Sequence, residues 1–212
     1  MMRKYWMECL GTMFLVLTVS LTGTPIAIGT MFAALIYLGA HISGANYNPA
    51  ISLAMWVRGK LSLKDMWLYM AFQILGGFFA AGIYWVLAGQ RYFPLPPAGV
   101  VSWQHLIIEV LFTFLLAYTA LTVLTTKKLK GNYIYGLAIG LALLAITFLG
   151  GTYNPAVSAG PALFDALFKG VAYQGLPTYL LGTLTGGLFA GLAYRYFNPE
   201  EFKAKPVRAR KK

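Results

Sequence analysis

Charged residues are scarce in this chain, and acidic residues are the scarcest. Only 11% of its 212 residues are charged, Asp and Glu together number 6, and 58% of the residues are hydrophobic. The mean hydropathy is +0.65, far above that of a soluble domain. This composition excludes an ordinary soluble domain and indicates a protein of the lipid bilayer. The 23 glycines favour a tight helical bundle, because small residues let membrane helices approach closely.

Cysteine and histidine are nearly absent as well. Cys9 is the only cysteine and cannot form an internal disulfide, and neither His41 nor His105 has a Cys or His nearby at metal-ligand spacing. We therefore expect no metal, no cofactor and no redox chemistry. The serines have no His and Asp partners for nucleophilic catalysis, so we expect no enzyme.

A membrane-spanning helix needs ~20 mostly apolar residues, and six segments come close to this length. Two more apolar stretches, Pro49–Val57 and Pro155–Phe168, are too short to cross, and each begins at an Asn-Pro, so we interpret them as half-helices. The sequence thus predicts an all-α membrane protein with six transmembrane helices and two re-entrant half-helices. The six predicted spans are Tyr5–Leu21, Pro25–His41, Asp65–Gly89, Ser102–Leu124, Asn132–Leu149 and Pro177–Phe197. The first span has no convincing signal-peptide cleavage site after it.

The net charge of +11 lies mostly in short loops and in a basic tail, residues 199–212. If the N-terminus is cytoplasmic, only Arg91 and Lys169 of the 17 Lys and Arg residues lie outside, so the positive-inside rule predicts that both termini are cytoplasmic. Membrane topology explains this charge better than a nucleic-acid partner does. The short loops suit a plasma membrane or a prokaryotic inner membrane.

We interpret the chain as one domain that consists of two similar halves, at about 1–90 and 102–198. Three spans per half mean that the second half starts from the opposite side of the membrane, so the repeat is inverted and a site at its interface lies near the midplane. The matching segments are Met7–Phe14 with Ile108–Leu115, Tyr47–Ala50 with Tyr153–Ala156, and Gly76–Ala80 with Gly186–Ala190.

Two Asn-Pro-Ala motifs, Asn48-Pro49-Ala50 and Asn154-Pro155-Ala156, open the two half-helices. Asn is a favoured N-cap and Pro a favoured first helical residue, so each motif is a helix start. Inversion brings the two N-termini together from opposite faces, and each carries roughly half a positive charge that repels cations. The asparagine amides keep N–H donors for a passing oxygen, and the loop carbonyls ahead of the motifs supply acceptors.

Over essentially its whole length, the chain resembles the aquaporin and glycerol-facilitator family. This resemblance implies a passive channel domain for water and small neutral solutes such as glycerol, which excludes ions, and a homotetramer with one pore per subunit. The residues that carry it are Glu8-x-x-Gly11-Thr12, His41–Ala45 with Asn48-Pro49-Ala50, Gln73, Glu109, and Asn154-Pro155-Ala156-x-Ser158-x-Gly160–Leu163.

The chain departs from the family pattern at Val157, where most members have an arginine that lines the outer constriction. At family spacing the other constriction positions are Ile28, Ala142 and Gly151, the first two to within a residue. This set matches neither the water-selective nor the glycerol-type pattern. We therefore expect an outer constriction that is more apolar and has room for a wider pore.

Two alternatives stay open for this constriction. The outer loop at Tyr92-Phe93-Pro94 could fold over the pore and narrow it. Alternatively, Arg91, or otherwise Lys169, could replace the missing charge, since these are the only cations expected on the outer side.

Glu8 and Glu109 are ionisable groups inside spans, where a proton relay or ion site is the usual interpretation. Their symmetric positions favour a structural role instead, with both carboxylates accepting backbone N–H groups of the irregular loops. His41, at the inner end of the second span, is either a pH gate or a structural contact of the loop.

Two other functions compete with a passive channel. An ion-coupled secondary transporter also uses inverted repeats and broken helices, but here only Glu8 and Glu109 are available for coupling. A non-conducting structural protein with the same fold is compatible with Val157, although the intact Asn48 and Asn154 argue against it.

Overall fold

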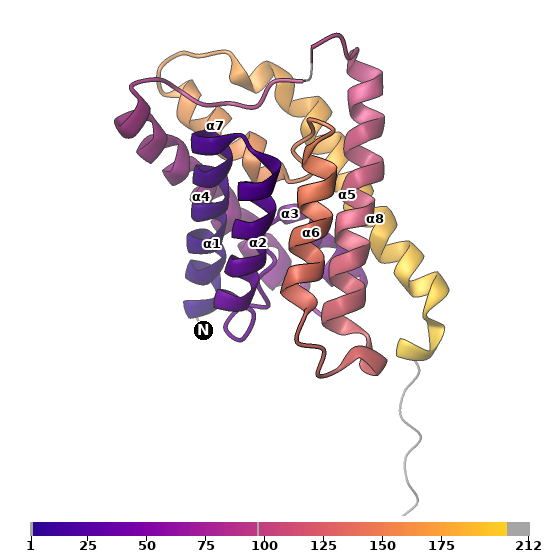
Figure 1. Cartoon of the computed structure of the whole chain (residues 1–212). Coiled ribbons are helices and arrows are strands. Elements are labelled where there is room, and N and C mark those ends of the chain that lie inside the picture. Colours follow the sequence, from indigo (N-terminus) through magenta and orange to yellow (C-terminus); the bar gives the residue numbers. More distant parts are fainter. Residues whose placement is uncertain (1, 97, 203–212) are drawn as a thin grey trace, which may run out of the picture.

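The computed structural model describes residues 2–96 and 98–202, and this part of the chain is helical, without a β-strand (Figure 1). The predicted all-α architecture, in which two half-helices lie among six other helices, is confirmed for these residues. The α-helices are α1 (Arg3–Thr22), α2 (Pro25–Gly39), α3 (Pro49–Val57), α4 (Leu63–Ala88), α5 (Ser102–Thr125), α6 (Tyr135–Thr147), α7 (Pro155–Ala166) and α8 (Leu176–Phe197). Short 3₁₀ turns lie at Lys127–Leu129, Ala172–Gly175 and Pro199–Glu201.

Helices α2 and α6 are shorter than predicted. They have 15 and 13 residues, or about 22 and 20 Å at 1.5 Å per residue, whereas α1, α4, α5 and α8 are long and apolar enough to cross a membrane. Each short helix ends early because the chain turns back toward a half-helix, with Gly44 and Gly150 at positive φ in the two returning loops. The second half-helix likewise ends at Ala166 instead of Phe168.

Each half-helix packs against the last long helix of the other half, α3 on α8 and α7 on α4. Glycines make these contacts close. A Cβ atom on Gly187 of α8 would collide with the carbonyl of Ala50 in α3, and one on Gly77 of α4 would collide with the carbonyl of Ala156 in α7. The two halves of the repeat are therefore interlocked through the half-helices.

The start of α1 and the end of α8 lie at the same end of the bundle (Figure 1). Figure 1 shows the N-terminus and the end of α8 at the lower end, and the loop from α4 to α5 at the upper end. The predicted tail, 199–212, begins with the turn Pro199–Glu201, which packs on the bundle, whereas its cations from Lys203 onward lie outside the described residues.

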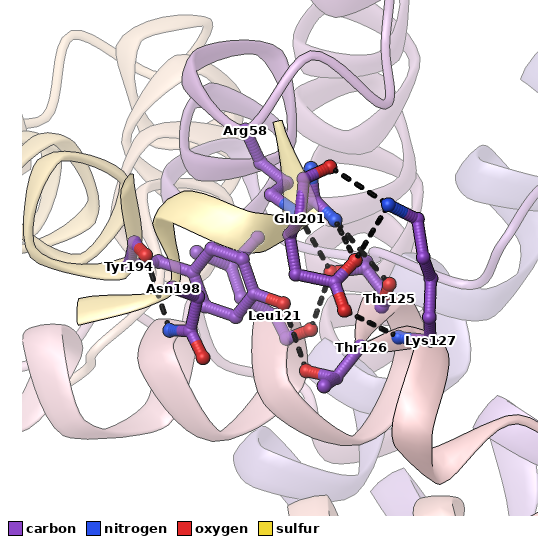
Figure 2. Close-up of polar contacts among 8 residues, drawn as sticks. All are labelled: Arg58, Leu121, Thr125, Thr126, Lys127, Tyr194, Asn198 and Glu201. Carbon is purple, nitrogen blue, oxygen red and sulfur yellow. Dashed lines mark hydrogen bonds and ion pairs between the residues drawn. The ribbon is translucent and has the colours of Figure 1, made fainter. Parts of the chain in front are cut away.

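Glu201 joins three helix ends at the lower end of the bundle (Figure 2). Its Oε2 lies 3.0 Å from Nη2 of Arg58, the C-cap of α3, and both side chains are buried. The backbone N–H of Lys127, just beyond α5, donates to Oε1 of Glu201 at 2.8 Å. Arg58 also donates to the hydroxyl of Thr125 at 3.1 Å. The ends of α3, α5 and α8 are thus held by one buried carboxylate.

Gly187→Ala tests the contact between α8 and α3. Because the new Cβ would meet backbone of α3, we expect a loss of about 1–3 kcal/mol in the free energy of unfolding and a lower melting temperature of the purified protein in detergent. Gly175→Ala is the control, since a Cβ there would come no closer than 3.6 Å to the ring of Tyr179. Equal melting temperatures for wild type and Gly187→Ala would contradict the close contact.

Candidate functional site

The two loops that lead into the half-helices have strained backbone immediately before each asparagine. Tyr47 has φ 49° and Tyr153 has φ 53°, the left-handed region that non-glycine residues rarely adopt. Such residues persist only where the surrounding structure holds them. Both tyrosine side chains are completely buried, and Gly11 of α1 leaves the space that the Tyr47 ring occupies.

Asn48 and Asn154 cap the half-helices and bind each other's loop. The Oδ1 of Asn48 accepts the N–H of Ala50 at 2.8 Å, and that of Asn154 accepts the N–H of Ala156 at 3.0 Å. The Nδ2 of Asn48 donates to the carbonyl of Tyr153 at 2.8 Å, and that of Asn154 donates to the carbonyl of Tyr47 at 2.9 Å. One N–H of each amide is used in this way, and the second remains available for another acceptor.

The first of these loops, between α2 and α3, is held in place by Glu8 of α1. One carboxylate oxygen accepts the hydroxyl of Ser43 at 2.6 Å and the N–H of Asn46 at 3.0 Å. The other accepts the N–H of Tyr47 at 2.6 Å and Nε2 of Gln73 at 2.7 Å. Glu8 is fully buried, and these four donors surround both of its oxygens.

The second loop, between α6 and α7, is held in place by Glu109 of α5, which accepts fewer hydrogen bonds than Glu8 does. It accepts the N–H and the hydroxyl of Thr152, at 2.6 and 3.0 Å, and the N–H of Tyr153 at 2.8 Å. Thr183 stands where the repeat would place a counterpart of Gln73, and its hydroxyl bonds within α8 instead. The imidazole of His105, one turn before Glu109, lies 3.6 Å from the carboxylate and is fully buried. The i, i+4 spacing of His105 and Glu109 on one helix was the signal in the sequence that could have predicted this contact.

A cavity of about 320 Å³ is lined by the two asparagines and by the loop between α4 and α5, and we call it the outer cavity after the predicted topology. The second loop, Asn48 and Asn154 supply most of its polar lining. Most of the remaining lining is apolar, and no residue of the lining carries a formal charge. The lining consists of Asn48, Thr147, Gly150, Gly151, Thr152 and Asn154, of Leu15, Val19, Gly23, Ile28, Phe32, Leu116, Leu143 and Val157, and of Tyr92–Leu95.

The structure brings three of the four predicted constriction residues, Ile28, Gly151 and Val157, to this cavity. The fourth, Ala142, does not line the cavity, and its neighbour Leu143 does, because adjacent residues of a helix such as α6 point about 100° apart. Leu143 is buried, whereas Ala142 packs on the edge of the core. At Gly151 a side chain would collide with the ring of Tyr153, so this wall is bare backbone.

The outer loop covers the cavity, and Arg91 does not enter it. Tyr92, Phe93, Pro94 and Leu95 all line the cavity from outside. Desolvation raises the pKa of the Tyr92 hydroxyl, which stays protonated and uncharged. Arg91 points instead to the end of α7, where its Nη1 lies 2.7 Å from Oδ1 of Asp165. Of the two alternatives for this region, the geometry favours the covering loop over a replacement charge.

The first loop also lines a smaller cavity, of about 250 Å³, at the inner side. Ser43, Gly44 and Asn46 form part of its wall, and Thr125 of α5 forms another part. His41 lies in the turn after α2, exposed and without a side-chain hydrogen bond to any described residue, so the structure does not bring it into the loop network. Across residues 2–96 and 98–202, no three His, Cys, Asp or Glu side chains gather as metal ligands would.

Comparison with known proteins agrees with this geometry. The family model of the major intrinsic proteins matches residues 14–194. The chain is 31% identical over 188 residues to Aquaporin AqpM of Methanothermobacter thermautotrophicus, covering 82% of this chain and 76% of that protein. It is 33% identical over 225 residues to the glycerol uptake facilitator protein-like 6 of Lactiplantibacillus plantarum, covering 94% and 100%. The fold is similar to the crystal structure of an aquaglyceroporin from Plasmodium falciparum, with TM-score 0.79, 19% identity and coverage of 94% and 98%.

Glu8→Gln tests the support of the first loop. A glutamine keeps one acceptor oxygen but presents an NH₂ group to the remaining donors. Buried donors without an acceptor each cost about 1–3 kcal/mol, so we expect a melting temperature several degrees lower in detergent. Glu200→Gln, at an exposed position, is the charge-matched control and should melt like wild type. An unchanged melting temperature for Glu8→Gln would instead favour a role of Glu8 in ion or proton movement.

Proposed function

We propose a function from one premise: the chain belongs to the major intrinsic protein family, whose model matches residues 14–194. It is an integral, multi-pass membrane protein and a passive channel for water and small neutral solutes such as glycerol. The relatives that carry this conclusion are an aquaporin and a glycerol uptake facilitator. We further propose that it assembles as a homotetramer with both termini in the cytoplasm.

The conducting path proposed here runs from the outer cavity, past Asn48 and Asn154, to the inner cavity. The opposed N-termini of α3 and α7 each present roughly half a positive charge at the two asparagines. A cation, hydronium included, is repelled there. A water or hydroxyl oxygen accepts the remaining N–H of each amide, and this turns it away from its neighbours in the file.

We propose that the outer constriction selects solutes by polarity and size, without a fixed charge. Val157, at the start of α7, packs beside Val16 and Ala80 and presents methyl groups to the cavity. The N–H and hydroxyl of Thr152 are bonded to Glu109, so the backbone carbonyls of the second loop are the acceptors that the polar wall offers to a solute. A solute with hydroxyl groups on one edge and carbon on the other matches both walls. The observation that carries the proposal is the uncharged 320 Å³ cavity.

The two buried glutamates support a channel over an ion-coupled transporter. Glu8 accepts four hydrogen bonds and Glu109 accepts three, all from groups that position the loops. A coupling carboxylate has to exchange its partners during transport, and these partners hold the asparagines in place. The flux should therefore have a low activation energy and no dependence on an ion gradient.

Val157→Arg tests the uncharged constriction. The guanidinium adds both volume and a cation, so we expect glycerol permeability in proteoliposomes to fall about tenfold or more, which is ~1.4 kcal/mol of barrier, and water permeability to fall less. Val171→Arg is the matched control, because Val171 is exposed and lies outside the cavity lining. Exclusion of glycerol and urea by the wild-type protein would contradict the wider apolar constriction.

Phe93→Ala tests the covering loop. Removing the ring opens the outer cavity, so we expect a rise of severalfold in glycerol permeability, the effect of ~1 kcal/mol, with water permeability nearly unchanged. Tyr173→Ala removes an exposed outer aromatic residue that does not line the cavity and serves as the control. Equal glycerol permeability in wild type and Phe93→Ala would show that the loop does not limit the pore.

A further inference from the structure

A groove of about 770 Å³ lies at the cytoplasmic end of the bundle, between the end of α3 and α8. It shares no lining residue with the outer cavity of the conducting path, and it shares only Lys60 with the inner cavity. Trp56 of α3, Leu188 and Leu192 of α8, and Phe202 beyond the last turn give it apolar walls. Trp56, Leu192 and Phe202 are all exposed, so their apolar surface faces outward from the bundle.

The floor of the groove is electrically balanced. Arg58 and Glu201 line it as a buried ion pair with 3.0 Å between Nη2 and Oε2. Arg58 also lies over the rings of Tyr194 and Phe202, at 4.9 and 4.6 Å from their centres. Figure 2 shows Glu201 between Arg58 and Lys127. This pair fixes Phe202 as a wall of the groove and leaves no net charge at its base.

The rim of the groove carries an excess of positive charge. Lys60 and Arg195 line it, and among the described residues neither has a carboxylate within ion-pair distance. Arg195 lies 5.1 Å from the centre of the Phe202 ring, so the guanidinium stands beside the apolar wall. The sequence beyond Phe202 adds six more Lys and Arg and no acidic side chain, so it brings no carboxylate side chain to neutralise the rim.

A membrane surface supplies one ligand that matches an apolar wall below a cationic rim. An anionic phospholipid places its phosphate at the interface, where Lys60 and Arg195 lie, and its acyl chains against Trp56 and Leu192. Lys and Arg near the cytoplasmic surface attract anionic lipids, and basic pockets at helix ends bind their headgroups. A free phosphate ion would use the rim alone and leave the apolar wall uncovered.

We propose that this groove is a binding site for an anionic phospholipid of the cytoplasmic leaflet. The lipid phosphate pairs with Lys60 and Arg195, and an acyl chain covers Trp56 and Leu192. The site rests on the orientation proposed above, with the end of α8 in the cytoplasm. A lipid held there contacts Phe202, the residue next to Glu201, and so lies beside the carboxylate that joins α3, α5 and α8.

Trp56 provides a direct readout. In a full-length variant with the other four tryptophans replaced by Phe, the fluorescence of Trp56 reports any brominated lipid that lies against it. The protein is reconstituted in mixed vesicles of phosphatidylglycerol and phosphatidylcholine, with only one of the two lipids brominated at a time. We expect phosphatidylglycerol to quench Trp56 with about fivefold or greater preference over phosphatidylcholine, the effect expected of one or two interfacial cations.

Charge variants test whether the lipid preference comes from the groove or from the general cytoplasmic surface. In the double variant Lys60→Gln with Arg195→Gln, the two lipids should quench Trp56 nearly equally. Lys64→Gln with Lys128→Gln removes the same charge from exposed cytoplasmic positions outside the groove and should keep the preference. A melting temperature in detergent equal to that of the tryptophan variant shows that each protein is folded. If the double groove variant misfolds, Lys60→Gln alone should lower the preference severalfold, since its side chain makes no contact that the fold requires.

Three outcomes would overturn the proposal. Equal quenching of Trp56 by both lipids would show that the groove does not select charge. An equal loss in the control variant would show a diffuse surface attraction. Loss of the preference with millimolar inorganic phosphate, but not with chloride of the same ionic strength, would show that the rim binds a free anion and not a lipid.

Discussion

Irregular backbone at membrane depth must find hydrogen-bond partners inside the protein, and two buried glutamates meet this requirement here. Each N–H group that is left unpaired in hydrocarbon costs several kcal/mol. Glu8 accepts the N–H groups of Asn46 and Tyr47, and Glu109 accepts those of Thr152 and Tyr153. These bonds hold both tyrosines at positive φ, immediately before each asparagine. Asn48 and Asn154 are therefore positioned by the carboxylates of Glu8 and Glu109, neither of which lines the outer cavity.

The second consequence of this constraint is that neither half of the repeat is complete alone. The amide of Asn48 binds the carbonyl of Tyr153, and the amide of Asn154 binds the carbonyl of Tyr47. The half-helices likewise cross over, since α3 packs on α8 and α7 on α4 through glycine contacts. A displacement of one loop is transmitted to the other asparagine through these bonds. The positive helix ends stay opposed because the two halves hold each other.

The sequence predicted the parts of this structure that recur twice. The inverted repeat, the two helix starts at Asn-Pro-Ala and the paired glutamates could all be recognised because each feature occurs in both halves. The parts that occur once were less predictable. Leu143 lines the cavity in place of Ala142, and spacing counted along the sequence does not fix which of two adjacent helical residues faces the cavity. The pairs of Arg91 with Asp165 and of Arg58 with Glu201 join residues 74 and 143 positions apart, and no local pattern indicates them.

The replacement of an arginine by Val157 changes how ions are excluded as well as which solutes fit. No residue of the outer cavity carries a charge, so the two half-helix ends are the positive field along the outer part of the path. A cation meets this field at the asparagines. An anion that sheds its hydration water finds no guanidinium to replace the lost hydrogen bonds. The entry of an ion that loses its hydration without gaining a partner is strongly unfavourable. In the proposed path neutral solutes meet neither barrier, so we expect their passage to depend on the space between Phe93 and Val157 and on the hydrogen bonds of the polar lining.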